Sequence, residues 1–119
     1  MALNPKIASI FDVFPDVLIL LGPDGKILDH KVPPTSEFYL APDAWQGKSL
    51  YSILPERVSS LFENTLNQVL QTQNPSSLEY SLSSEQQRKY YEARVIPIGE
   101  NQAIAIIRNI SDRKQKEMQ

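Results

Sequence analysis

Apolar residues recur with clear periods along this chain, and the first change of period lies near residue 15. Before it, apolar side chains fall on one stripe at helical spacing, after an Asn4-Pro5 pair typical of a helix start. This stripe consists of Ile7, Ile10, Phe11 and Phe14. Residues 16–21 are then almost entirely apolar, which indicates a strand. The turn at 22–25 predicts a hairpin with a second strand over 26–31.

The middle of the chain predicts one long amphipathic helix. Residues 32–55 are irregular and broken by prolines, which favours short helical turns, with Gly47 supplying a backbone bend. From Pro55, apolar residues recur every three or four positions until residues 73–75 end the pattern. The apolar positions of this helix are Val58, Leu61, Phe62, Leu66, Val69 and Leu70.

Three further strands are expected after this helix. Apolar and polar residues alternate over 78–82 and again over 91–97, and residues 103–108 form an apolar run. Because this last run is apolar on both faces, we expect it beside the first strand in the centre of the sheet. The order of elements predicts an α+β domain with a single five-stranded antiparallel sheet. Short helices and the long helix cover one face, and an N-terminal amphipathic helix is added.

The chain changes from apolar to charged directly after the last strand. Asn109 and Ser111 are residue types that cap helices, and Asp112 places a carboxylate in the first turn, where the helix dipole favours negative charge. A helix is therefore expected from about Ser111. Too few residues follow for a stable isolated helix, so we expect the natural polypeptide to continue; the alternative is a frayed tail. The expected organisation is a cap helix over 1–15, a core domain over 16–110 and the start of a signalling helix over 111–119.

Composition restricts the chemistry of this chain. It has no cysteine, which excludes disulfides, thiolate nucleophiles and cysteine zinc sites, and its net charge of -2 argues against nucleic-acid binding. The single histidine, His30, has no recognisable partner motif, so neither a catalytic residue nor a metal site is predicted. No apolar run approaches the ~20 residues that span a bilayer, and the N-terminus lacks a signal-peptide pattern. A cytoplasmic location without membrane insertion is expected.

Four groups of residues together resemble a known family. They are FPDVLILL at 14–21 with PDGKIL at 23–28, GKSL at 47–50 leading to ILP at 53–55, YEARVIP at 91–97, and IRNISDRK at 107–114. In this order and spacing they resemble the PAS sensor domain, a small module of bacterial signalling proteins, over residues 5–117. The family usually ends in Asp-Ile-Thr, whereas this chain has Asn109-Ile110-Ser111. An amide and a hydroxyl keep the capacity to form hydrogen bonds, but a carboxylate is lost.

The resemblance implies a regulatory role without catalytic residues of its own. Such a module senses a stimulus or forms a homodimer inside a larger protein, most often a sensor histidine kinase of a two-component system or a diguanylate cyclase. Its signal would leave through Asn109, Ile110, Ser111 and Asp112 into an effector domain that follows. Haem-binding members place a histidine on the long helix, and covalent flavin needs a cysteine; this chain has neither, so neither cofactor is expected.

The resemblance also implies a pocket for a small apolar or aromatic ligand between the sheet and the short helices. Its candidate lining residues are Phe38, Trp45, Leu61, Phe62, Tyr80 and Tyr91. The same spacing is typical of an ordinary filled core, and a constitutive interaction module without a ligand is therefore the alternative function. A small enzyme is a third and weaker hypothesis. The N-terminal stripe is expected to mediate dimerisation, with capping of its own sheet as the alternative.

Overall fold

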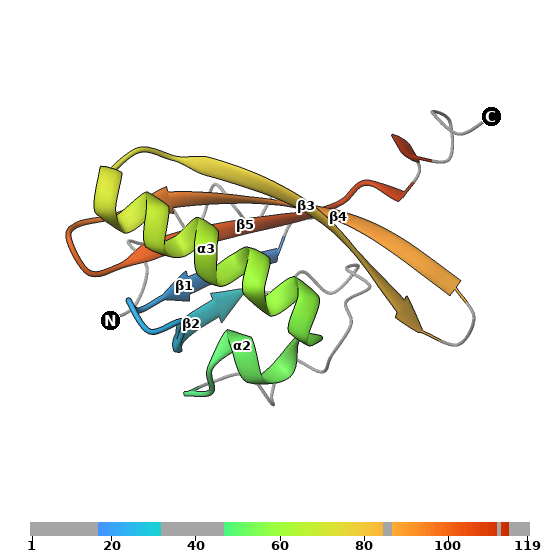
Figure 1. Ribbon diagram of the computed structural model, residues 1–119, viewed down its shortest axis with the longest axis horizontal. Helices are drawn as coiled ribbons and strands as arrows, with labels where there is room; N and C mark the ends of the chain where they lie inside the picture. The colour runs from blue at the N-terminus through green and yellow to red at the C-terminus, as the bar shows by residue number, and fades with distance from the viewer. Residues whose placement is uncertain (1–16, 32–46, 85–86, 112, 115–119) are drawn as a thin grey trace.

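The computed structural model describes residues 17–31, 47–84, 87–111 and 113–114. They form one antiparallel sheet of five strands in the order β2-β1-β5-β4-β3. The elements are β1 (Val17–Leu21), β2 (Ile27–Lys31), α2 (Leu50–Ile53), α3 (Glu56–Thr72), β3 (Ser76–Ser84), β4 (Gln87–Pro97) and β5 (Ala103–Asn109). Figure 1 shows α3 lying along one face of this sheet, with α2 near its N-terminal end.

This architecture confirms the predicted α+β fold. The final strand, β5, pairs with β1 on one side and β4 on the other, so it occupies the centre of the sheet as its apolar pattern indicated. Every residue of β1 is buried, which fits a strand covered on both faces. The N-terminal helix expected over 1–15 lies outside the described residues.

The hairpin between β1 and β2 is joined directly to the segment before α2. Gly25 adopts a φ of 81°, which glycine tolerates, and its carbonyl accepts a hydrogen bond of 2.8 Å from the Leu50 N–H. The Ile27 N–H donates to the Lys48 carbonyl at 2.8 Å, and the Gly47 N–H donates to the Ile27 carbonyl at 3.0 Å. These bonds fix the position of α2 relative to the hairpin.

The helices α2 and α3 are joined by a buried serine. The Ser59 hydroxyl lies within hydrogen-bonding distance of two carbonyls, that of Tyr51 in α2 at 2.8 Å and that of Leu54, between the two helices, at 3.1 Å. At its other end α3 stops at Gln73, whose φ of 58° is left-handed and whose N–H donates to the Val69 carbonyl. The predicted end of the long helix is therefore confirmed.

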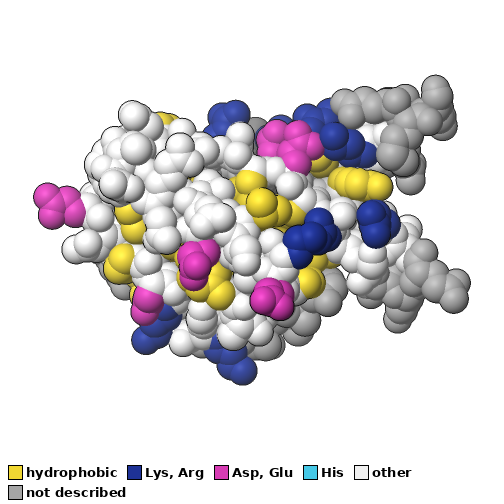
Figure 2. Space-filling model, viewed as in Figure 1, with side chains coloured by type: hydrophobic (Ala, Val, Ile, Leu, Met, Phe, Trp, Pro, Cys, Tyr) yellow, Lys and Arg dark blue, Asp and Glu magenta, His cyan; other side chains and the backbone are white. Residues whose placement is uncertain are grey.

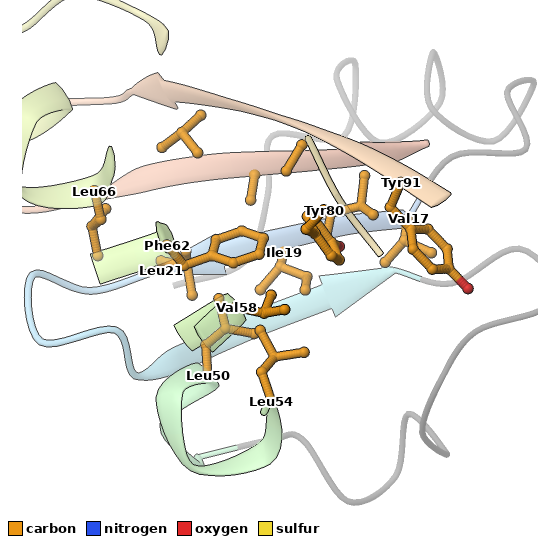
Figure 3. Close-up of a cluster of buried hydrophobic side chains, with 14 of the residues drawn as sticks. Val17, Ile19, Leu21, Leu50, Leu54, Val58, Phe62, Leu66, Tyr80 and Tyr91 are labelled. Carbon is orange, nitrogen blue, oxygen red and sulfur yellow. The ribbon is translucent and has the colours of Figure 1, made fainter. Parts of the chain in front are cut away.

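The sheet has apolar side chains on both faces. The larger cluster lies between the sheet and α3, and Figure 3 shows its members converging from α2, α3 and the strands. Alternate residues of β1 and β5 point to the opposite face and form a second cluster. The second cluster, called the outer cluster here, consists of Leu18, Leu20 and Ile104, with Leu28, Ile98 and Ile106 packed against it.

Candidate functional site

Three aromatic side chains meet inside the larger cluster, each from a different element. The rings of Phe62 on α3 and Tyr80 on β3 contact edge to face, with centroids 5.2 Å apart and planes at 65°. Tyr80 stacks on Tyr91 of β4 at 5.5 Å and 22°, and the two residues are directly paired in the sheet register. Figure 3 shows this group between α3 and the sheet. We call Phe62, Tyr80 and Tyr91 the aromatic stack.

The hydroxyl of Tyr80 is a polar group inside this apolar stack. It is buried and has no hydrogen-bond partner among the residues that the structure describes. Burial, with a smaller contribution from Tyr91, raises the pKa of Tyr80 far above its usual value, so the hydroxyl keeps its proton. A buried hydroxyl without a partner is destabilising by about 1–3 kcal/mol. The stack therefore presents one unused hydrogen-bond donor.

The structure brings together three of the six residues predicted to line a pocket. Leu61 does not join them: it is 38% exposed, whereas Phe62 is 1% exposed. Neighbouring helix residues point about 100° apart, so the helix that turns Phe62 into the core turns Leu61 toward solvent. Leu61 must therefore be removed from the group of interior candidates. Phe38 and Trp45 lie outside the described residues.

The chain leaves the sheet through a hydrogen-bonded junction at Asn109, Ile110 and Ser111. The Ser111 N–H donates to Asn109 Oδ1 at 2.9 Å, as a capping side chain does. The Ile110 N–H donates to the Tyr90 carbonyl at 2.8 Å, and the Tyr90 N–H donates to Ser111 Oγ at 3.0 Å. The Lys114 N–H then bonds the Ile110 carbonyl at 3.0 Å, which closes one helical turn. Asp112, also predicted here, lies outside the described residues.

One acidic side chain on β3 contacts the same helical turn. Glu79 Oε1 lies 2.9 Å from Lys114 Nζ, and Glu79 Oε2 lies 3.6 Å from Arg113 Nη2. The hydrogen bond from Lys114 is the main reason that the pKa of Glu79 falls below its usual value. Sequence reasoning missed Glu79 and Tyr90. Strand alternation placed Glu79 on the wet face, but no sequence signal showed which cations would lie beside it.

A shallow polar cleft lies on the outer side of α2 and α3. It has a volume of about 220 Å³ and is lined by Tyr51, Leu54, Glu56, Ser59, Ser60 and Glu63. The Tyr51 hydroxyl is buried, and no group in the described parts of the chain forms a hydrogen bond with it. Burial, followed by the charges of Glu63 and Asp24, raises the pKa of Tyr51 to about 12. Figure 2 shows acidic side chains scattered over this face of the molecule.

The described residues contain no group of three or more His, Cys, Asp and Glu side chains placed to hold a metal ion. His30 lies on β2, paired with Ile19 of β1. Within the same parts of the chain, no helix is both long and apolar enough to cross a membrane.

Comparison with known proteins identifies the fold. A family described as PAS fold matches residues 11–115, which is most of the chain. Among curated proteins, none matches.

Solved structures with the same fold come from several bacteria. The PAS domain of a Colwellia psychrerythraea protein is 18% identical with a TM-score of 0.71, and the match covers 91% of this chain and 97% of that one. A sensory box sensor histidine kinase from Vibrio cholerae is 16% identical with a TM-score of 0.64, covering 89% of this chain and 90% of that one. The PAS domain of the Cronobacter turicensis RpfR quorum-sensing receptor, in complex with BDSF, is 15% identical with a TM-score of 0.64. That match covers 81% of this chain and 94% of the receptor domain.

Proposed function

Because this chain belongs to the PAS fold family, we propose that it is a sensory and dimerisation module of a cytoplasmic bacterial signalling protein. The effector that it regulates follows it in the polypeptide and is a histidine kinase or a diguanylate cyclase. The module itself is regulatory and contributes no catalytic residue. The similarity to a sensor histidine kinase from Vibrio cholerae supports the first type of effector.

One observation carries this proposal. Tyr80 of β3 is paired with Tyr91 of β4, and Tyr91 is paired with Asn109 of β5, so a single row crosses three strands. The row begins in the aromatic stack and ends at the residue whose side chain caps the outgoing helical turn. A change in the packing of the stack therefore has a direct route to the junction.

The proposed stimulus is a small apolar or aromatic ligand bound at the aromatic stack. The rings supply apolar contact, and the Tyr80 hydroxyl supplies a donor that none of the described residues uses. A ligand with an acceptor atom would relieve the free-energy penalty of that donor. The RpfR domain, which was solved in complex with BDSF, is a relative in which this fold holds a bound compound. Neither haem nor covalently bound flavin is part of the proposal.

The output step is tested at Ile110, which is 5% exposed. Its N–H donates to the Tyr90 carbonyl, and its own carbonyl accepts from the Lys114 N–H. In the natural protein with its effector, Ile110→Ala should change the basal activity of the effector and weaken its response. The physical reason is that truncation of a buried side chain loosens the attachment of the outgoing turn to β4. Leu61→Ala, on the exposed side of α3, is the control and should leave both activities unaltered. Unchanged effector activity in Ile110→Ala would argue against this route.

Dimerisation is proposed through the N-terminal stripe of Ile7, Ile10, Phe11 and Phe14. A short amphipathic helix cannot bury its apolar stripe alone, so it must pack on its own sheet or on that of a second copy. Sedimentation of the wild-type chain at high micromolar concentration should show a dimer that Ile10→Asp dissociates. A strict monomer that this substitution does not affect would remove the hypothesis for the isolated chain.

The alternative function is a constitutive interaction module with a filled core. The close ring contacts of the aromatic stack favour it, because they show that neighbouring side chains already pack against one another. Native mass spectrometry and an absorption spectrum of freshly purified protein separate the two functions. A stoichiometric bound molecule supports the sensor, whereas an empty domain with a high melting temperature supports the interaction module.

A further inference from the structure

The two faces of β3 carry adjacent residues with different contacts. Successive strand residues point to opposite faces, so Tyr80 points into the aromatic stack and Glu79 points outward. Glu79 contacts the start of the outgoing helix through Lys114 at 2.9 Å and Arg113 at 3.6 Å. A residue inside the stack and a residue that touches the output segment are therefore neighbours in one strand.

A second carboxylate lies opposite Glu79, so the positive charges of Lys114 and Arg113 matter more for Glu79. In the register, Glu79 of β3 is directly opposite Glu92 of β4, and Glu92 is opposite Arg108 of β5. Like charges directly opposite each other on neighbouring strands repel. Lys114 and Arg113 bring positive charge to Glu79, so departure of the helical turn would leave the two carboxylates facing each other with less compensation.

We propose that Glu79 is a second attachment point for the outgoing helix, and that repacking of Tyr80 in the stack releases the helix there. This inference deepens the proposed function and rests on it for the source of the signal. The junction at Asn109, Ile110 and Ser111 holds the base of the helix through hydrogen bonds, whereas Glu79 sets the direction in which the first turn leaves the sheet.

The exposure of the three side chains suits a reversible contact. Glu79 and Arg113 have side chains that are 47% and 48% exposed, and that of Lys114 is 28% exposed. Ion pairs in such positions are weak and are screened by salt. A contact of this strength shifts a population between two arrangements without locking either one, which is what a ligand-dependent equilibrium requires.

Amide hydrogen exchange at Lys114 tests the attachment in this chain, because its N–H closes the helical turn on the Ile110 carbonyl. Glu79→Gln should speed this exchange by about two- to fivefold, the effect expected for loss of a surface ion pair. Glu92→Gln is the matched control, since Glu92 lies on the same face one strand away, and it should not speed exchange. About 1 M salt should speed exchange more in the wild-type chain than in E79Q. Exchange in E79Q equal to that of the wild type would overturn the attachment.

The link to the stack is tested by combining variants. Tyr80→Leu removes the ring contacts and should speed Lys114 exchange in the wild-type background, with no further increase in the E79Q background. If Tyr80→Leu does not fold, Phe62→Leu perturbs the stack from the helix side. An equal effect of either substitution in both backgrounds would overturn the link.

These measurements need no ligand or effector. If they fail while Ile110→Ala still changes the effector, only the role of Glu79 is wrong. If Glu79 behaves as proposed while Ile110→Ala has no effect, the proposed output route through the junction is wrong and the attachment at Glu79 is purely structural.

Discussion

Within the described ranges, the hydroxyls of Tyr51 and Tyr80 are buried without hydrogen-bond partners. Each rests on a ring that packs well: Tyr80 contacts Phe62 and Tyr91, and Tyr51 covers Gly25 closely. Ring burial is favourable, whereas an unpartnered hydroxyl is unfavourable. The unpartnered hydroxyl is therefore tolerated, because burial of the ring stabilises the fold by more than the hydroxyl destabilises it.

Replacement of the inner hydroxyl tests this balance. Tyr80→Phe keeps the ring contacts and removes the unpartnered donor, so the free energy of unfolding should rise by about 1–3 kcal/mol. Urea unfolding of the ligand-free chain measures the change. Tyr91→Phe, the residue paired with Tyr80, is the control for a general effect of losing a hydroxyl and should not stabilise. A loss of stability in Tyr80→Phe would show that the hydroxyl has a partner.

Two neighbouring residues of α3 allow a buried position to be compared with an exposed one. Phe62→Ala should lower the free energy of unfolding by about 3–5 kcal/mol, because Phe62 is 1% exposed and contacts Tyr80. Leu61→Ala should lower it by less than about 1 kcal/mol, because that side chain is 38% exposed. Denaturant unfolding of both variants gives the comparison. A small loss for Phe62→Ala would point to a roomy cavity beside the ring, and would favour the ligand pocket over the filled core.

Hydrophobic spacing predicted that Phe62, Tyr80 and Tyr91 are interior side chains, but not that their rings contact one another. The pattern on α3 identified Phe62 and Leu61 alike, because a stripe with intervals of three and four is wider than the surface that the sheet covers. The ion pairs could not be predicted from the sequence, for a different reason. The pairing of Glu79 with Lys114 depends on the direction in which the chain leaves β5, and nothing in the local sequence specifies that direction.

The hairpin of β1 and β2 depends on α2 for its support. The ring of Tyr51 lies so close to Gly25 that a Cβ at this position would clash with the ring. The sequence predicted the turn from its Gly-Pro-Asp-Gly composition, and it predicted the two strands. It did not predict that α2 packs on the turn, because that contact joins residues far apart in the chain and follows from the tertiary arrangement.

Alanine substitutions at two glycines distinguish the destabilisation caused by backbone strain from that caused by the contact with Tyr51. Gly25 and Gly99 both have positive φ, and no atom lies within 4 Å of a Cβ at Gly99. Gly99→Ala should destabilise by about 1–2 kcal/mol through the backbone alone. Gly25→Ala should destabilise by about 1–3 kcal/mol more, because the Tyr51 ring must move. Thermal or urea unfolding tests both variants, and equal losses would show that the ring yields without penalty.

The whole molecule has apolar clusters on both faces of one sheet, and its ionisable groups are mostly at the surface. In the part of the chain that the structure describes, burial raises the pKa of Tyr51 to about 12 and that of Tyr80 far above its usual value. In the unfolded chain both lose their protons near pH 10. Above that pH the folded state binds more protons than the unfolded state, so stability falls as pH rises.

The contribution of these two tyrosines to the free energy of unfolding should therefore be constant below about pH 10. It should decline from there toward pH 12. Urea unfolding at increasing alkaline pH measures the decline. The variant Y51F/Y80F should show a shallower decline than the wild type, since other titrating residues are the same in both chains. Parallel curves for the two proteins would contradict the assignment.

The central position of β5 also decides when the domain is completed as the ribosome makes it. β1 and β2 are synthesised early, and β3 and β4 later. No strand joins these two pairs until β5 pairs with β1 and β4. A nascent chain that stops before Ala103 therefore carries two half-sheets with open edges, which are prone to wrong pairing and aggregation. Native assembly must wait for the last strand, so the element that leads out of the domain is also the one that closes it.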